Sequence, residues 1–271
     1  MAGHPFRFGI VGSPRGTGEQ WLATARRTAD LGYGTLLVPD GLGLHAPFPS
    51  LAAVAAVPGL RLGTFVLAAP MRPPRSAAWE GHSLTALTGG RFEFGIGTGR
   101  PDARAEVEQL GRPWGTGAQR LDLLRDTVAH LRRLDGDRHT PVLMAASGPR
   151  ALALAAAEAD IVTLSVPPRT AREEIRRLAG ELRDLAGDRD PELAMNAFLV
   201  GDAVPPWAER ILGADPALPA VEDTMAVLRG SVVEMADELR RRRDSVGVSY
   251  IVVGESFVDD LAPVVELLAG T

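Results

Sequence analysis

The stretch PVLMAASGPRALALAAAEADIVTLS, residues 141–165, contains one complete strand–helix–strand unit. Apolar runs at 142–145 and 161–165 have the length and composition of buried strands, and the Ala/Leu-rich segment 150–158 has the pattern of a helix. Two neighbouring strands joined through a helix run parallel to each other. This stretch therefore predicts a parallel α/β sheet.

The same alternation continues through all 271 residues. Strands are expected at 6–11, 35–38, 60–67, 92–96, 142–145, 161–165, 193–200 and 249–253. Helices are expected at 18–31, 51–57, 119–134, 150–158, 171–185, 232–243 and 258–268, with a further helix ending near Leu87. Eight strand-then-helix units favour an α/β fold of the (β/α)8 TIM-barrel type, with an open doubly wound sheet as the alternative. We expect residues 1–271 to form one barrel domain.

The composition removes several classes of chemistry. All 29 basic residues are arginine, and the chain contains no lysine and no cysteine. A lysine Schiff base, a phosphate-binding lysine, a thiolate nucleophile and a zinc–cysteine site are therefore excluded. No serine lies in a nucleophile-elbow sequence and no acidic or histidine residues have persuasive metal-ligand spacing, so neither a serine hydrolase nor a metal enzyme is expected. The chemistry must come from other side chains, backbone dipoles or a bound cofactor.

The charge and hydropathy patterns restrict the partners. The net charge is −5, whereas nucleic acid or an anionic membrane surface favours a basic protein face. No uninterrupted apolar run reaches the roughly 18 residues of a membrane span, and the N-terminus lacks the pattern of a signal peptide. We expect a cytoplasmic protein with a small-molecule substrate and with neither a nucleic-acid nor a membrane partner.

Two glycine-containing turns follow consecutive strands of the predicted barrel. Gly97-Thr98-Gly99 follows the fourth strand, and Ser147-Gly148-Pro149-Arg150 follows the fifth and opens a helix. Active sites of TIM barrels lie at the C-terminal ends of the strands. Backbone N–H groups at a helix N-terminus bind anions, so the second turn is a candidate phosphate site reinforced by Arg150. The alternative is an ordinary tight turn with proline at the first helical position.

Five stretches, taken in order, carry a resemblance to a known family. They are LGYGTLLVPD (31–40), RLGTFVL (61–67), SLTALTGGRFEFGIGTG (83–99), PVLMAASGPR (141–150) and the closing part from the basic helix to the LAPVV helix (240–268). Over nearly its whole length the chain resembles the bacterial luciferase-like flavin and deazaflavin oxidoreductases. Its closing pattern resembles the actinobacterial branch that uses coenzyme F420.

The resemblance implies a TIM barrel whose mouth binds a flavin-type ring and whose turn after the fifth strand binds the cofactor phosphate. The ring and ribityl chain are expected at Asp40, Gly41, Phe65, Val66, Thr98 and Gly99, and the phosphate at Ser147, Gly148, Pro149 and Arg150. Members of the family often have a non-prolyl cis peptide in the third-strand bulge, which corresponds here to Phe65–Val66. Because the family commonly dimerises, we also expect a homodimer.

The chain departs from the family pattern at three places. Many relatives have Asp-His after the second strand, but here the pair is Asp40-Gly41. Relatives acting on sugar phosphates carry Glu after the Gly-Thr/Ser-Gly turn, where this chain has Arg100, and the usually long connection before the fifth strand is reduced to 135–140. The nearest titratable substitute is His45, which we predict as the catalytic acid or base. A loop histidine that only forms surface hydrogen bonds is the alternative.

Two large or charged residues near the predicted mouth have structural explanations. Glu106 lies in the first turn of a short helical segment, where an acidic side chain interacts favourably with the helix dipole. Trp114 lies in the Gly-Arg-Pro-Trp-Gly loop, where it packs against the protein or flanks a bound ring.

Three functions remain from the sequence. The first is hydride transfer between coenzyme F420 and a small organic substrate, in which the cofactor supplies the chemistry and the barrel supplies orientation. The second is an FMN-dependent monooxygenase, which would use the same barrel mouth. The third is a degenerate, non-catalytic barrel that acts as a binding protein, which the missing acid and base positions favour.

Overall fold

A computed structural model describes residues 3–213 and 224–271. The strands are β1 (Arg7–Val11), β2 (Thr35–Val38), β3 (Arg61–Thr64), β4 (Leu67–Ala68), β5 (Phe92–Gly97), β6 (Val142–Ala146), β7 (Ile161–Leu164), β8 (Glu192–Ala197), β9 (Leu199–Val200), β10 (Val227–Leu228) and β11 (Val248–Gly254). The α-helices are α1 (Gly18–Asp30), α2 (Pro47–Ala53), α3 (Pro74–Leu87), α4 (Arg104–Gln109), α5 (Gly117–Asp135), α6 (Pro149–Glu158), α7 (Arg172–Ala186), α8 (Ala208–Leu212), α10 (Val232–Val246) and α11 (Val258–Leu268). Short 3-10 helices lie at η1 (Ala69–Met71), η2 (Pro101–Ala103) and η3 (Glu255–Phe257).

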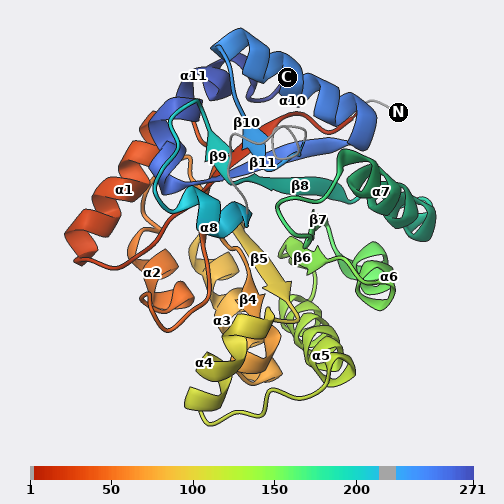
Figure 1. The fold of residues 1–271 in the computed structure, drawn as a ribbon. Coiled ribbons are helices and arrows are strands. Elements are labelled where there is room, and N and C mark those ends of the chain that lie inside the picture. Colours follow the sequence, from red (N-terminus) through yellow and green to blue (C-terminus); the bar gives the residue numbers. More distant parts are fainter. Residues whose placement is uncertain (1–2, 214–223) are drawn as a thin grey trace.

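The main sheet is a closed parallel barrel. Its strand order is β3-β2-β1-β11-β8-β7-β6-β5-β4, and an additional pairing between β3 and β5 closes the ring. The helices surround the strands (Figure 1). The predicted (β/α)8 barrel is therefore confirmed, and the open doubly wound sheet is excluded.

Three element boundaries differ from the sequence prediction. The second helix begins at Pro47 rather than at Leu51, because proline is well suited to the first helical position. The expected strand 60–67 is divided into β3 and β4, and the expected strand 193–200 is divided into β8 and β9. Strand β9 pairs with β10 in a separate two-stranded sheet. The Pro-rich segment 204–219, between the expected strand 193–200 and the expected helix 232–243, lies partly outside the described residues.

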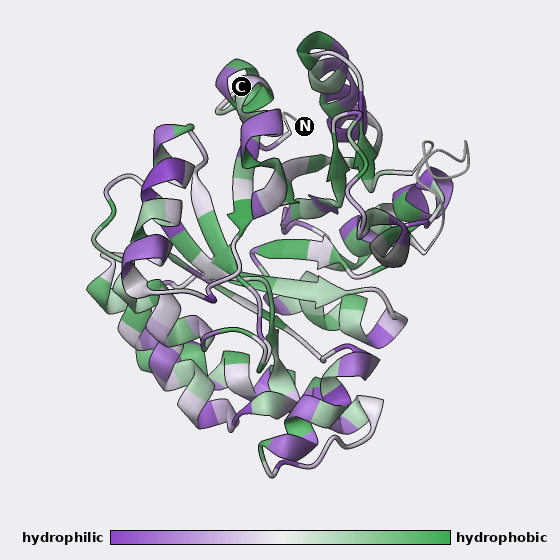
Figure 2. Ribbon diagram, turned by 60° about the vertical axis from the view of Figure 1, so that its left-hand side comes forward, coloured by the Kyte–Doolittle hydropathy of each residue, from purple (hydrophilic) through white to green (hydrophobic). Residues whose placement is uncertain are grey.

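The space between the barrel and its helices holds the main hydrophobic core. Outward-facing strand residues such as Phe8, Leu36 and Phe92 are fully buried there against the helices. Figure 2 shows that hydrophobic residues dominate the central strands, whereas hydrophilic residues concentrate on the surrounding helices. Within the described ranges, no helix has the length and apolar character needed to cross a membrane.

The lower end of the barrel interior, where the strands begin, is filled by an ionic network. Glu93 on β5 accepts hydrogen bonds from Arg7 (2.9 Å), from Arg61 (2.7 Å) and from the Tyr250 hydroxyl (3.3 Å). Arg7 Nε also donates to Glu192 Oε1 at 3.2 Å. The Nη2 atom of Arg7 lies 3.1 Å from Glu192 Oε2, an ionic contact whose angle falls outside hydrogen-bond geometry.

Above this network most of the inward side chains are apolar. A separate cluster of buried side chains occupies the inside of the barrel, with three half-buried residues packed against it. The cluster consists of Leu37, Leu143, Ile161, Ala194, Tyr250 and Val252, and the half-buried residues are Val11, Phe65 and Val66. The half-buried residues lie towards the upper end, where the strands finish, and we refer to this end as the mouth of the barrel.

Candidate active site

The mouth of the barrel has one wall formed by the break between β3 and β4. The peptide bond Phe65–Val66 is cis, as the resemblance implies. Thr64 replaces the interrupted strand pairing, because its hydroxyl donates to Gly95 O (2.7 Å) and accepts from Gly95 N (2.9 Å). A Cβ atom on Gly95 would lie 1.8 Å from Thr64 O, so only glycine allows this approach. The half-buried Phe65 and Val66 side chains consequently form an apolar shelf at the mouth.

Asp40 forms hydrogen bonds that hold β4 and η1, the segment that follows this shelf, in place. Its carboxylate accepts from Arg72 Nη1 (2.6 Å) and Nη2 (2.8 Å) and from the backbone N–H of Ala68 (3.0 Å). The Asp40 side chain is only 2% exposed. Both oxygens are thus engaged within the protein, and the geometry gives Asp40 a role in holding β4 and η1 in place. The sequence alone did not identify Arg72 as its partner.

Gly41, the next residue, leaves room for a carboxylate from another loop. Glu106 on α4 accepts from Leu42 N at 3.0 Å, and a Cβ atom on Gly41 would lie 3.4 Å from Glu106 Oε2. Glu106 therefore does more than complement a helix dipole: it links α4 to the loop after β2. The helical segment at Glu106 was expected, but its contact with the loop after β2 was not, because the two lie 64 residues apart along the chain.

His45 joins two loops at the rim. Its Nε2 lies 2.9 Å from Gly16 O, so the ring must donate from Nε2, and its backbone N–H donates to Pro14 O at 2.9 Å. This arrangement leaves Nδ1 as the acceptor of the neutral ring. His45 is exposed, and its catalytic role stays a prediction.

Thr98 and Gly99 lie at the end of β5 beside an aromatic side chain. Gly99 has φ +84, and a Cβ atom there would lie 3.0 Å from Trp114. Arg120 stacks over the Trp114 ring at 4.2 Å and donates to Thr98 O at 3.0 Å. Trp114 is thus held by packing on one side of the mouth, next to two of the six residues expected to line the ring and ribityl chain.

The start of α6 has the free backbone donors expected of an anion site. Gly148 is the N-cap residue and provides no side-chain cap, and Pro149 occupies the first helical turn. Helices α1, α5 and α10 begin with capping boxes formed by Thr17, Thr116 and Ser231, whereas α2, α3, α7 and α11 have no side-chain cap, like α6. Gly148, Pro149 and Arg150 are exposed and Ser147 is half-buried, so the predicted phosphate turn is accessible at the same end of the barrel as the shelf.

Asn196 on β8 is a candidate that the sequence analysis missed. Its Oδ1 atom is buried and has no hydrogen-bond partner among the described residues. The sequence feature that could have identified Asn196 is its position as the one polar residue in an otherwise apolar strand, LAMNAFLV (193–200). The direction of its side chain, however, follows only from the strand register.

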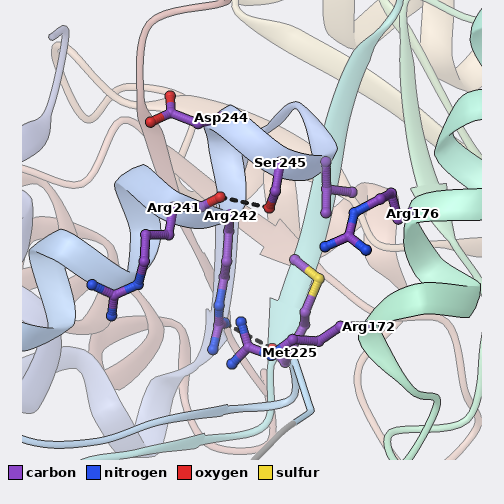
Figure 3. Close-up of a pocket in the computed structure, with 8 residues that line it drawn as sticks. Arg172, Arg176, Met225, Arg241, Arg242, Asp244 and Ser245 are labelled. Atoms are coloured by element: carbon purple, nitrogen blue, oxygen red, sulfur yellow. Dashed lines mark hydrogen bonds between the residues drawn. The ribbon is translucent and has the colours of Figure 1, made fainter.

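A cavity of about 480 Å³ lies outside the barrel, between α7 and α10 (Figure 3). Arg172, Arg241 and Arg242 all contact one carboxylate, Glu238, and Arg242 also donates to Met225 O (2.9 Å) and to Val227 O (2.6 Å). Burial opposes ionisation of Glu238, but the hydrogen bonds and charges of Arg242 and Arg172 hold its pKa below the ordinary value. The cluster joins two helices and β10, so we assign it a structural role.

Two sequence comparisons relate the chain to known proteins. Residues 4–205 match the sequence profile of the family described as Luciferase-like monooxygenase. An F420-dependent glucose-6-phosphate dehydrogenase from Intrasporangium calvum is 32% identical over 118 residues, which cover 40% of this chain and 35% of that protein. The matching segment therefore spans about a third of that curated relative's length.

Solved structures resemble the fold over almost its whole length. An F420-dependent secondary alcohol dehydrogenase, in complex with an F420–acetone adduct, has a TM-score of 0.76 at 17% identity, covering 96% of this chain and 98% of that one. The oxygenating constituent of 3,6-diketocamphane monooxygenase from Pseudomonas putida, in complex with FMN, has a TM-score of 0.72 at 13% identity, covering 97% and 95%. At these identities the likeness establishes the shared fold.

Proposed function

The chain belongs to the luciferase-like monooxygenase family, and we propose that it is an F420-dependent oxidoreductase that transfers a hydride between the deazaflavin and a small organic substrate. The family makes an enzyme using F420 or FMN the expected function. The observation that carries the proposal is the combination, at one end of the barrel, of an apolar shelf, a helix N-terminus without a side-chain cap and a half-buried asparagine whose buried Oδ1 has no partner among the described residues.

The residues at the mouth fit a flavin-type cofactor. Phe65 and Val66 offer an apolar surface for one face of a planar ring. At Gly254 an added Cβ would meet no atom within 4 Å, so the wall at the end of β11 leaves open space. The α6 N-terminus, with Arg150, provides backbone donors and a positive charge for a phosphate.

In this proposal the protein binds and orients the cofactor and the substrate, and it excludes water from the site. The bound cofactor supplies the hydride chemistry. Asp40 keeps the shelf in place through Ala68 and Arg72, and Trp114 closes one side beside Gly99. We propose His45 as the residue that exchanges the substrate proton, at Nδ1, because its Nε2–H is committed to Gly16 O.

The choice of F420 over FMN is supported by an F420-dependent relative that is 32% identical over 118 residues. The FMN-dependent monooxygenase remains the second candidate, because a structure with bound FMN shares the fold. Both cofactors carry a phosphate and a flavin-type ring, so the same residues serve either one.

Cofactor titration with an oxygen test separates the candidates. We expect the purified protein to bind F420 more tightly than FMN, as followed by cofactor absorbance, and to leave the oxidation rate of reduced F420 unchanged when oxygen is admitted. Tight FMN binding together with oxygen-dependent oxidation of reduced FMN would replace the proposal by the monooxygenase. If neither cofactor raises the melting temperature at saturating concentration, the chain is a binding protein of another kind.

We further propose that the protein is a homodimer that uses the outer face of α3. Trp79 and Leu87 lie eight residues apart on this helix and are 65% and 75% exposed. That spacing puts both side chains on one stripe, and large exposed apolar groups gathered on one face mark interaction surfaces. Sedimentation should give a dimer for the native chain and a monomer for the double variant Trp79→Arg, Leu87→Arg. A monomeric native chain would contradict this proposal.

A further inference from the structure

The side chain of Asn196 points into the barrel. Along β8, Glu192 contacts Arg7 inside the lower end of the barrel, and Ala194 belongs to the inner apolar cluster. Successive strand residues alternate between two faces, so residues 192, 194 and 196 share the inner one. Asn196 pairs in register with Val252, which is also an inner residue. Asn196 is therefore the uppermost inward side chain of β8.

The level of Asn196 in the barrel follows from the register. In an eight-stranded barrel the strand tilt offsets neighbouring strands by about one residue, and inward side chains of alternate strands form layers of four. Tracing the paired positions around the closed ring gives one such upper layer. It consists of Val11, Phe65, Ala145 and Asn196. This layer is the floor of the mouth.

Within this floor Asn196 faces the shelf. Counting around the ring, β8 is four strands away from β3, so Asn196 lies opposite Phe65. The other members of the floor have no polar side-chain atoms, which explains why Asn196 Oδ1 finds no donor. A buried polar atom without a partner reduces stability. Asn196 is half-buried, but its Oδ1 has almost no accessible surface, so the amide has to rotate for this acceptor to face a molecule that reaches the floor.

We propose that Asn196 binds the imide edge of the cofactor ring. This inference rests on the proposed function. The amide is complementary to a cyclic imide, since Oδ1 accepts from the imide N–H while Nδ2 donates to an adjacent carbonyl. Deazaflavin and flavin rings share this imide, so the assignment holds for F420 and for FMN. Ala145 in the floor and Gly254 above it are small enough to leave room for the edge of a ring.

The test removes first the cofactor's imide N–H and then the Asn196 amide, the two partners of the proposed hydrogen bond. Dissociation constants of F420, FMN and their N3-methyl derivatives, in which the imide N–H is absent, are measured for the native chain and for Asn196→Leu. We expect the native chain to bind the unmethylated cofactor about tenfold more tightly than its N3-methyl derivative, the value of one buried hydrogen bond of about 1.4 kcal/mol. Asn196→Leu should bind both forms equally.

Thr163→Val provides the matched control. Thr163 is an inward residue of β7, paired in register with Ala194 below the floor, and its substitution should preserve the tenfold preference. Melting temperatures establish that each variant folds. Equal binding of both cofactor forms by the native chain would overturn the assignment of Asn196 while leaving the proposed function intact. Absence of binding by F420 and by FMN would overturn both.

Discussion

The two ends of the barrel interior are built on opposite principles. At the lower end Glu93 is buried, and its carboxylate accepts from two arginines and a tyrosine. At the upper end Asn196 Oδ1 is buried with no partner, and the α6 N-terminus has no side-chain cap. The carboxylate at the lower end is fully engaged within the protein, whereas Asn196 Oδ1 and the first backbone donors of α6 at the upper end have no side-chain partner among the described residues. Residues that stabilise the fold and residues that bind a ligand thus lie at opposite ends of the barrel axis, as in TIM barrels generally.

The pKa shifts at the lower end agree with this division. Burial raises the pKa of Tyr250 well above its ordinary value, and the charge of Glu93 adds to the effect. Burial also raises the pKa of Glu192, although the charge of Arg7 opposes it. These ionisable groups are enclosed at the closed end, away from the mouth, so we expect them to act on folding rather than on catalysis.

The largest effect should come from breaking the network at the lower end. Glu93→Ala leaves Arg7 and Arg61 without their shared carboxylate, which should lower the free energy of unfolding by about 3–5 kcal/mol. Urea denaturation measures the change. Glu108→Ala, which removes an exposed pair with Arg104, should cost under about 1 kcal/mol. Similar losses for the two variants would show that the network contributes little.

A mouth residue with a structural role should give the next largest effect. Asp40→Ala removes the acceptor of Arg72 and of Ala68 N, and we expect a loss of about 2 kcal/mol in the free energy of unfolding. Cofactor affinity should fall as well, because η1 and the shelf lose their anchor. Unchanged stability with weakened binding would instead make Asp40 a direct cofactor ligand.

Arg150→Ala should affect binding alone. The side chain is exposed, so the free energy of unfolding should change by less than about 0.5 kcal/mol. Affinity for a phosphate-containing cofactor should fall about tenfold through loss of one charge-assisted contact. Riboflavin, which lacks the phosphate, is the matched probe and should bind the variant and the native chain equally. Unaltered cofactor affinity would remove the phosphate assignment.

Asn196→Leu should stabilise the protein and lower its affinity for the cofactor. Replacing a buried oxygen that lacks a partner by an apolar group removes its desolvation cost, so the free energy of unfolding should rise by about 1 kcal/mol. Chemical denaturation without cofactor measures this gain. A decrease in stability would mean that the amide already has a partner in the free protein.

The smallest effect is a pH dependence at the lower end. Because the folded-state pKa of Glu192 is raised, its contribution to stability is complete below the unfolded pKa of about 4.3 and is lost as pH rises through the folded value. Glu192→Gln does not titrate. The stability of this variant relative to the native chain should therefore increase from pH 4 to pH 7, as measured by denaturation at each pH. A relative stability that decreases over this range would contradict the assigned shift.

The sequence predicted the barrel because apolar strands and helices alternate along the chain, and most of the element boundaries were close. It also located the cis peptide, through the family resemblance. Asn196 could not be assigned, because a shift of one residue in register would turn it from the interior to the helices. The partners of Glu93 are equally hidden, since Arg7 lies 86 residues away along the chain. Only barrel closure brings such residues together.

Local pairs across neighbouring loops were missed for a related reason. Arg72 and Asp40 lie 32 residues apart, and Glu106 and Leu42 lie 64 apart. Each contact depends on how a loop folds after its strand, which periodicity does not describe. The sequence located the loops of the mouth but not the bonds that fix them.

A crystal structure of the protein with F420 would locate the cofactor relative to the residues of the mouth. We expect the ring to lie on Phe65–Val66, its imide N–H to lie within hydrogen-bond distance of Asn196 Oδ1, and its phosphate to contact the backbone N–H groups at the start of α6. A cofactor bound elsewhere, such as in the arginine-lined cavity between α7 and α10, would contradict this expectation.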